Sequence, residues 1–215
     1  MIMEENKNLK LARQARAENN SEDAKLFYNK VREEFPDNGE AKFFYAYYAL
    51  YEGKNIELAG KFANLCKGVV PSINMIKNSS LSKEEQLASI EEIMNSFVPE
   101  TWVLNRYMNN KNHETKIGDK YVTVFNFNEI ASVCRNGMAS IKEVGDTVEK
   151  LYINDAECKR LAVIAWKEYV SLSQKWYRWA VKGDAEIYAE KIKAVDPTYE
   201  MPKKAGCISL ANKKD

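Results

Sequence analysis

The sequence predicts an all-α protein, and three observations support that prediction. Apolar residues recur at spacings of three and four along most of the 215 residues, which is the repeat of one helix face. Capping residues, prolines and Asn-Gly turns divide these stretches into helix-length segments. Only residues 115–125 have strand-like composition, and we expect a small hairpin or an ordered loop there.

Four helices are expected in the first third of the chain. Asn19-Asn20-Ser21 ends the first helix, and Ser21 is the predicted N-cap of the second. Pro36 ends the second helix, and the Asp37-Asn38-Gly39 turn precedes the third. The third reaches Gly53, and the fourth ends near Gly68 or Pro71. The expected ranges are residues 6–18, 21–35, 39–51 and 56–70.

This stretch resembles the tetratricopeptide-repeat family. One repeat is matched by Leu11, Ala12, Ala15, Asn19, Asn20, Ala24, Tyr28, Val31, Pro36 and Asn38. A looser unit is formed by Tyr45, Ala46, Ala49, Gly53, Lys54 and Pro71. Pro36 and Pro71 lie 35 residues apart, against a family period of about 34. A weaker echo is formed by Ala185, Ala189, Ile192 and Pro197.

The second half predicts a long antiparallel helical hairpin. Ser82 with Glu85, Asn126 with Glu129 and Asn154 with Glu157 are the expected N-terminal capping pairs. Two apolar series then step by four and three, which predicts one packed seam on each of two helices, with about 26 residues per arm. The series are Ile130, Cys134, Gly137, Ile141, Val144, Val148 and Leu151, and then Cys158, Ala162, Ala165, Tyr169, Leu172, Trp176 and Trp179. Trp166 lies off this seam, and we expect it to be partly exposed.

We expect one continuous, solenoid-like array. Residues 1–78 form two tetratricopeptide-like hairpins in this interpretation. Residues 79–215 form a helical extension that contains the long hairpin and a final repeat-like helix.

Composition argues against several classes of function. Lys and Arg number 32 against 31 acidic residues, so we do not expect a nucleic-acid partner. No apolar run reaches the ~18 residues of a membrane helix, and we expect a soluble cytoplasmic protein. Four separated cysteines and the single His113 form no known ligand spacing, so we expect neither a metal nor a cofactor. No catalytic residues are expected, and we do not expect an enzyme.

The aromatic third helix is the candidate binding element. Phe43, Tyr47 and Tyr51 step by four and share one face. The resemblance implies that the first helix of each repeat lines a ligand-facing groove, which would place Arg13 and Arg16 beside these rings. It therefore implies a module that binds a peptide or partner protein through carboxylate and apolar contacts.

Two alternatives remain at this point. The rings could instead pack under the C-terminal hairpin as core. The chain could also be a small-molecule or regulatory sensor with an aromatic pocket between the repeats and that hairpin. The oligomeric state stays open between a monomer and a homo-oligomer.

Overall fold

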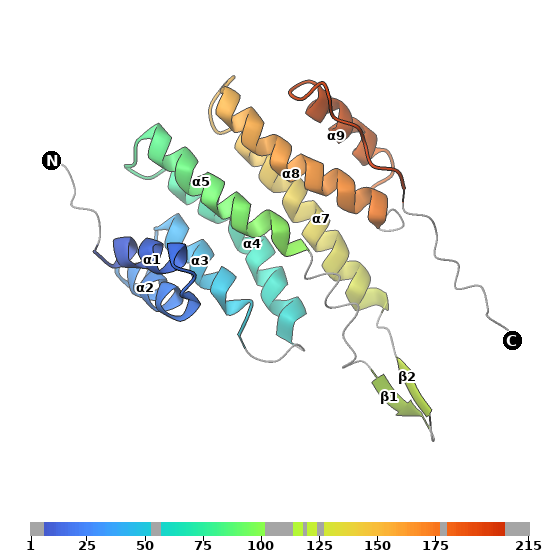
Figure 1. Cartoon of the computed structure of the whole chain (residues 1–215), viewed down its shortest axis with the longest axis horizontal. Helices are drawn as coiled ribbons and strands as arrows, with labels where there is room; N and C mark the ends of the chain where they lie inside the picture. Colours follow the sequence, from blue (N-terminus) through green and yellow to red (C-terminus); the bar gives the residue numbers. More distant parts are fainter. Residues whose placement is uncertain are drawn as a thin grey trace, which may run out of the picture.

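The computed structural model describes residues 7–52, 57–101, 114–117, 120–123, 127–176 and 180–204. This part of the chain forms eight α-helices, a short 3-10 helix and one pair of strands (Figure 1). The all-α prediction is therefore confirmed. The elements are α1 (Lys7–Ala17), α2 (Ser21–Glu34), α3 (Gly39–Ala49), α4 (Leu58–Lys77), α5 (Lys83–Phe97), η2 (Val98–Thr101), β1 (Glu114–Ile117), β2 (Lys120–Thr123), α7 (Phe127–Glu149), α8 (Ala156–Lys175) and α9 (Asp184–Lys193).

The helices follow one another across the molecule in chain order, from α1 and α2 at one side to α9 at the other (Figure 1). Short connections at residues 18–20, 35–38 and 150–155 fold consecutive helices back on each other. Helix α4 packs against α3, α5 and α7, so it joins the first helices to the last ones. The strands β1 and β2 pair antiparallel, as a small hairpin in the segment where one was expected.

Side-chain N-caps are present at the starts of α2, α3, α5 and α8. Ser82 and Glu85 form the expected capping box at the start of α5. The N-cap of α2 is Asn20 rather than Ser21, and the N-cap of α8 is Asp155 rather than Asn154. Asn19 and Asn154 both adopt a left-handed backbone conformation with a φ of +57°. In each case the N-cap is the residue that directly follows, and it lies one position from the residue we expected.

Helix α4 continues past the proline at which we expected it to end. Pro71 lies inside the helix with its ring exposed to solvent. Beyond it, Ile73 and Ile76 are buried, which contributes about 1.5–3 kcal/mol for each side chain. That burial offsets the roughly 3 kcal/mol penalty of an internal proline. Pro36 and Pro71 therefore do not mark equivalent helix ends, and this element of the repeat prediction is wrong.

The long hairpin of α7 and α8 has the predicted seam. The seam residues whose side chains are described are buried, with Leu151 and Trp176 partly buried at the ends. The helices contain 23 and 20 residues, shorter than expected. Ile130, Trp179 and the pair Asn126 and Glu129 lie outside the residues whose side chains are described.

Trp166 is buried, at 1 % exposure, so the expectation of partial exposure is wrong. Gly145 makes room for it, because a Cβ there would lie 2.5 Å from the indole ring. The indole N–H donates to Asp146 at 3.2 Å, and the ring contacts Tyr188 of α9 at 5.9 Å between centroids. Helix α9 thus covers a side of α8 whose burial the seam spacing did not predict.

Candidate interaction surface

A buried carboxylate, Glu40, holds the first three helices together. It lies in the first turn of α3 and is 4 % exposed. Arg13 of α1 donates to it through Nε at 3.0 and 3.1 Å and through Nη2 at 2.6 Å. Tyr28 of α2 donates its hydroxyl proton to Glu40 at 3.0 Å. Such bidentate, charge-assisted contacts satisfy a carboxylate that would otherwise be costly to bury.

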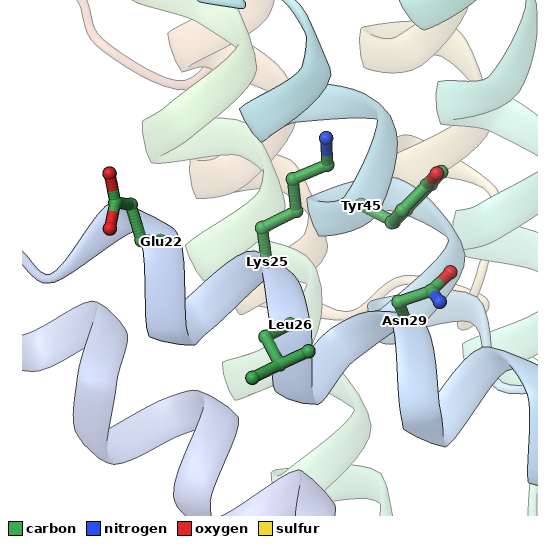
Figure 2. Close-up of a pocket in the computed structure, with 5 residues that line it drawn as sticks. All are labelled: Glu22, Lys25, Leu26, Asn29 and Tyr45. Carbon is green, nitrogen blue, oxygen red and sulfur yellow. The ribbon is translucent and has the colours of Figure 1, made fainter.

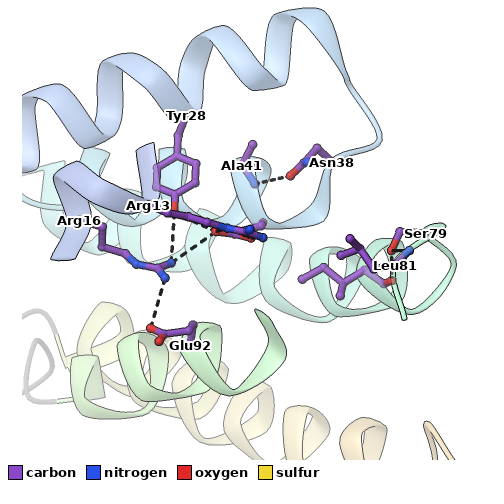
Figure 3. A network of polar contacts seen from close by, with 10 residues as sticks. Arg13, Arg16, Tyr28, Asn38, Ala41, Ser79, Leu81 and Glu92 are labelled. Carbon is purple, nitrogen blue, oxygen red and sulfur yellow. Dashed lines mark hydrogen bonds and ion pairs between the residues drawn. The ribbon is translucent and has the colours of Figure 1, made fainter. Parts of the chain in front are cut away.

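Arg16 extends this network to a fourth helix. Its guanidinium lies 3.6 Å from Glu40 and 3.4 Å from Glu92 of α5, and it donates to the Tyr28 hydroxyl at 3.1 Å (Figure 3). It also lies 4.3 Å above the ring of Phe44, a favourable cation–π distance. Burial raises the pKa of Tyr28, and the Glu40 charge raises it further, so this hydroxyl stays protonated and donates.

Both predicted arginines therefore have carboxylate partners within the chain. Arg13 and Arg16 lie on the same side of α1, as their spacing predicted, but they bind Glu40 and not an open groove. Their side chains are 34 % and 19 % exposed. In this arrangement they fix α1 against α3 and α5.

The three predicted rings of α3 differ in their environments. Phe43 is 1 % exposed and packs edge-on against Phe44 at 5.1 Å, so it is a core residue and not a contact residue. Tyr47 is partly buried, and Tyr51, just after the helix, is 49 % exposed. The spacing of four continues along one side of α3, but α5 packs against this helix and covers part of it.

Tyr51 is held by a second buried carboxylate, Glu100 in η2. The Tyr51 hydroxyl donates to Oε1 of Glu100, and the rings of Tyr47 and Tyr51 lie 5.6 Å apart, edge to face. Glu100 is 3 % exposed. Burial raises the pKa of Tyr47, and the nearby Glu100 charge also raises it. Tyr51 is thus an exposed ring held in one orientation by a buried group.

The five predicted site residues do not form one cluster. Arg13 and Arg16 gather around Glu40 at the start of α3, whereas Tyr51 follows the end of that helix. Tyr51 lies eleven positions after Glu40, which corresponds to about 16 Å along a helix axis. The structure therefore divides the predicted surface into an arginine end and a tyrosine end.

Neither organising carboxylate was identified from the sequence. Glu40 directly follows the Gly39 turn and looks like an ordinary charged residue in a first helical turn. The one feature of the sequence that could have indicated its burial is its position in a largely apolar and aromatic helix. Glu100 follows Pro99, and nothing in its neighbours indicates burial.

A shallow hollow lies on another side of α3, between α2 and α3. Its volume is about 330 Å³, and it is lined by Glu22, Lys25, Leu26, Asn29 and Tyr45 (Figure 2). Leu26 is 50 % exposed, and Lys25 pairs with Glu52. The hollow is open to solvent and contains no buried polar group directed into it, so it carries little binding chemistry.

The described residues contain no group of three or more His, Cys, Asp or Glu side chains that could hold a metal ion. Burial raises the pKa of Cys66 to about 12 and of Cys134 to about 11, which disfavours the thiolate form. His113 and Cys207 lie outside the described residues.

No helix in the described part has the length and apolar character to cross a membrane. Comparison of the chain with protein-family models, curated proteins and solved structures found no match.

Proposed function

We propose that this chain is a non-enzymatic interaction module, built as a tetratricopeptide-like helical array, that binds a peptide or partner protein on the face formed by α1, α3 and η2. The observation behind the proposal is Tyr51. Its ring is 49 % exposed, yet its hydroxyl is fixed on Glu100. A tyrosine held in one rotamer loses little side-chain entropy when a partner packs against it.

The tyrosine end is favoured over the arginine end. Tyr47 and Tyr51 provide ring surface, and tyrosine is among the residue types enriched at the energetically dominant positions of interfaces. Arg13 is partly exposed but already binds Glu40. A partner that reaches from Arg13 to Tyr51 would cover about 16 Å, or roughly five residues of extended peptide.

The sensor hypothesis has less support from the described residues. A ligand pocket needs open space between the rings. Phe44 instead stacks on Tyr28 at 5.1 Å and meets Phe43 edge to face at the same centroid distance. These rings pack against one another within the first three helices.

The test compares Tyr51, which lies just after α3, with Tyr45 within α3. Tyr51→Ala removes the exposed ring, and Tyr45→Ala is the matched control on the side of α3 that faces α2, where Arg32 lies 3.8 Å above that ring. Partners captured from lysate by the wild-type chain are identified by mass spectrometry and then purified. Tyr51→Ala is expected to weaken binding of the purified partner at least tenfold, a loss of about 1.4 kcal/mol.

Tyr45→Ala should leave that affinity unchanged, and melting temperatures establish that both variants are folded. The proposal is contradicted if Tyr51→Ala binds the purified partner as tightly as wild type does. Equal losses in the two variants would also contradict it, because they would place the interface elsewhere on α3.

A further inference from the structure

The two buried carboxylates of the α3 face have different partners. Glu40, at 4 % exposure, is met by Arg13, Arg16 and the hydroxyl of Tyr28. Glu100, at 3 % exposure, accepts a hydrogen bond from Tyr51 at Oε1, and Tyr47 also donates to this carboxylate. Its Oε2 has no hydrogen-bond partner among the described residues. No ion pair among the described residues includes Glu100. Within the described part of the chain, this deeply buried carboxylate therefore has no compensating cation.

Such an arrangement is costly for the folded chain. A buried polar atom with no partner loses its interactions with water and gains nothing in return, and this loss is larger when the atom is charged. Burial raises the pKa of Glu100, and the hydrogen bonds from Tyr51 and Tyr47 offset this only in part. A cation placed at Oε2 would remove this penalty, because it supplies both a donor and the opposite charge.

The surroundings of Glu100 suit a cation in two ways. Tyr47 and Tyr51 present ring surface beside the carboxylate, and a ring face attracts ammonium and guanidinium groups. Tyr51 is also half exposed, whereas Oε2 is buried, so a cation reaches Oε2 only when the neighbouring side chains move apart. An anion would be repelled by the carboxylate, and a purely apolar group would leave Oε2 unsatisfied.

We propose that Glu100, Tyr47 and Tyr51 form a recognition site for a cationic side chain, a lysine ammonium or an arginine guanidinium, presented by the partner of this module. The cation donates to Oε2 of Glu100 and lies against the rings of Tyr47 and Tyr51. This inference rests on the proposed function, because it specifies the chemistry of the partner that the module binds.

The experiment is an NMR titration of the ¹⁵N-labelled chain with three small probes. Nα-acetyl-lysine amide and Nα-acetyl-arginine amide carry the cation, and Nα,Nε-diacetyl-lysine amide is the matched neutral probe. The cationic probes are expected to shift the backbone amides of Tyr47, Tyr51 and Glu100 in a saturable way. The neutral probe should not. The relative affinities of the lysine and arginine probes identify the preferred cation.

Glu100→Gln keeps the shape of the side chain and an acceptor for Tyr51 but removes the charge, and it should weaken the cationic probes at least tenfold. Glu84→Gln changes the net charge equally at an exposed position in the first turn of α5 and should leave the affinity unchanged. Equal affinity of Glu100→Gln and wild type would overturn the proposal. So would equal shifts by the neutral probe, or no saturable shift at up to about 100 mM of either cation, well above a millimolar Kd.

Thermal unfolding without a probe gives an independent readout. A carboxyl group whose pKa is raised in the folded state stabilises the fold fully below its unfolded pKa, and that contribution is lost as the pH rises through the folded pKa. The melting temperature of the wild type should therefore fall relative to that of Glu100→Gln as the pH increases from 4 to 7. Saturating lysine probe should reduce this difference. A difference that stays constant with pH would show that Glu100 is not an uncompensated charge.

The outcomes separate the two proposals. If the purified partner requires Tyr51 but binds Glu100→Gln normally, the interaction module stands and the cation site is wrong. If the purified partner binds Tyr51→Ala as tightly as the wild type while the lysine probe still binds at Glu100, the proposed interface is wrong and the cation site stands.

Discussion

Glu40→Gln tests whether the buried carboxylate, and not apolar packing alone, holds α1 and α2 to α3. The substitution keeps the size of the side chain but removes the charge that Arg13 and Arg16 share. Breaking a buried ion pair costs about 3–5 kcal/mol, because the remaining charge is left uncompensated. The Arg13 side chain is 34 % exposed, so water recovers part of that loss. We expect the free energy of unfolding to fall by about 2–4 kcal/mol.

The assay is equilibrium urea unfolding followed by far-UV circular dichroism, with Glu92→Gln as the matched control. Glu92 also pairs with Arg16, at 3.4 Å, but its side chain is 54 % exposed. Exposed pairs contribute about 0–1 kcal/mol, so the control should change stability by less than about 1 kcal/mol. A loss below about 1 kcal/mol for Glu40→Gln, or equal losses in both variants, would refute the reasoning.

The remaining predictions concern packing and thiol chemistry. Leu172→Ala, at a seam position 4 % exposed, should lower stability by about 2–5 kcal/mol in urea unfolding, and a loss below about 1 kcal/mol would mean that the seam is not core. Gly39→Ala should cost about 3 kcal/mol, because its Cβ would lie 2.2 Å from the backbone oxygen of Ser72. Gly60→Ala, in a helix with no atom within 4 Å of the added Cβ, should raise the melting temperature instead, with a gain of about 0.5–1 kcal/mol. Cys66, with its pKa raised to about 12 by burial, should react with a disulfide reagent at pH 8 only when the chain unfolds, and rapid labelling of the native protein would contradict this.

Local sequence features predicted the elements well where a few neighbouring residues decide the structure. The capping box of Ser82 and Glu85 forms as expected because its hydrogen bonds join residues three apart. The seam positions of α7 and α8 are buried because helical periodicity fixes which residues share a face. The same local rule was wrong at Pro71, where burial of apolar residues beyond the proline outweighs its local penalty.

The candidate site was predicted only in part. Spacing placed Arg13 and Arg16 together and aligned Phe43, Tyr47 and Tyr51. It gave no information on which long-range partners these side chains meet, because that depends on how the helices pack in three dimensions. In the structure Phe43 is buried, and both arginines are paired with Glu40.

By itself, the sequence determined an all-α chain, most of its helices, and the two seams of the long hairpin, because caps and periodicity act over three or four residues. Only the tertiary structure decided the partners of the two buried carboxylates. Glu40 and its arginines are 24 or more residues apart, and Glu100 is 49 residues from Tyr51. Whether a carboxylate meets a guanidinium or is left with an unpartnered oxygen depends on helix packing across those distances, which no local pattern encodes.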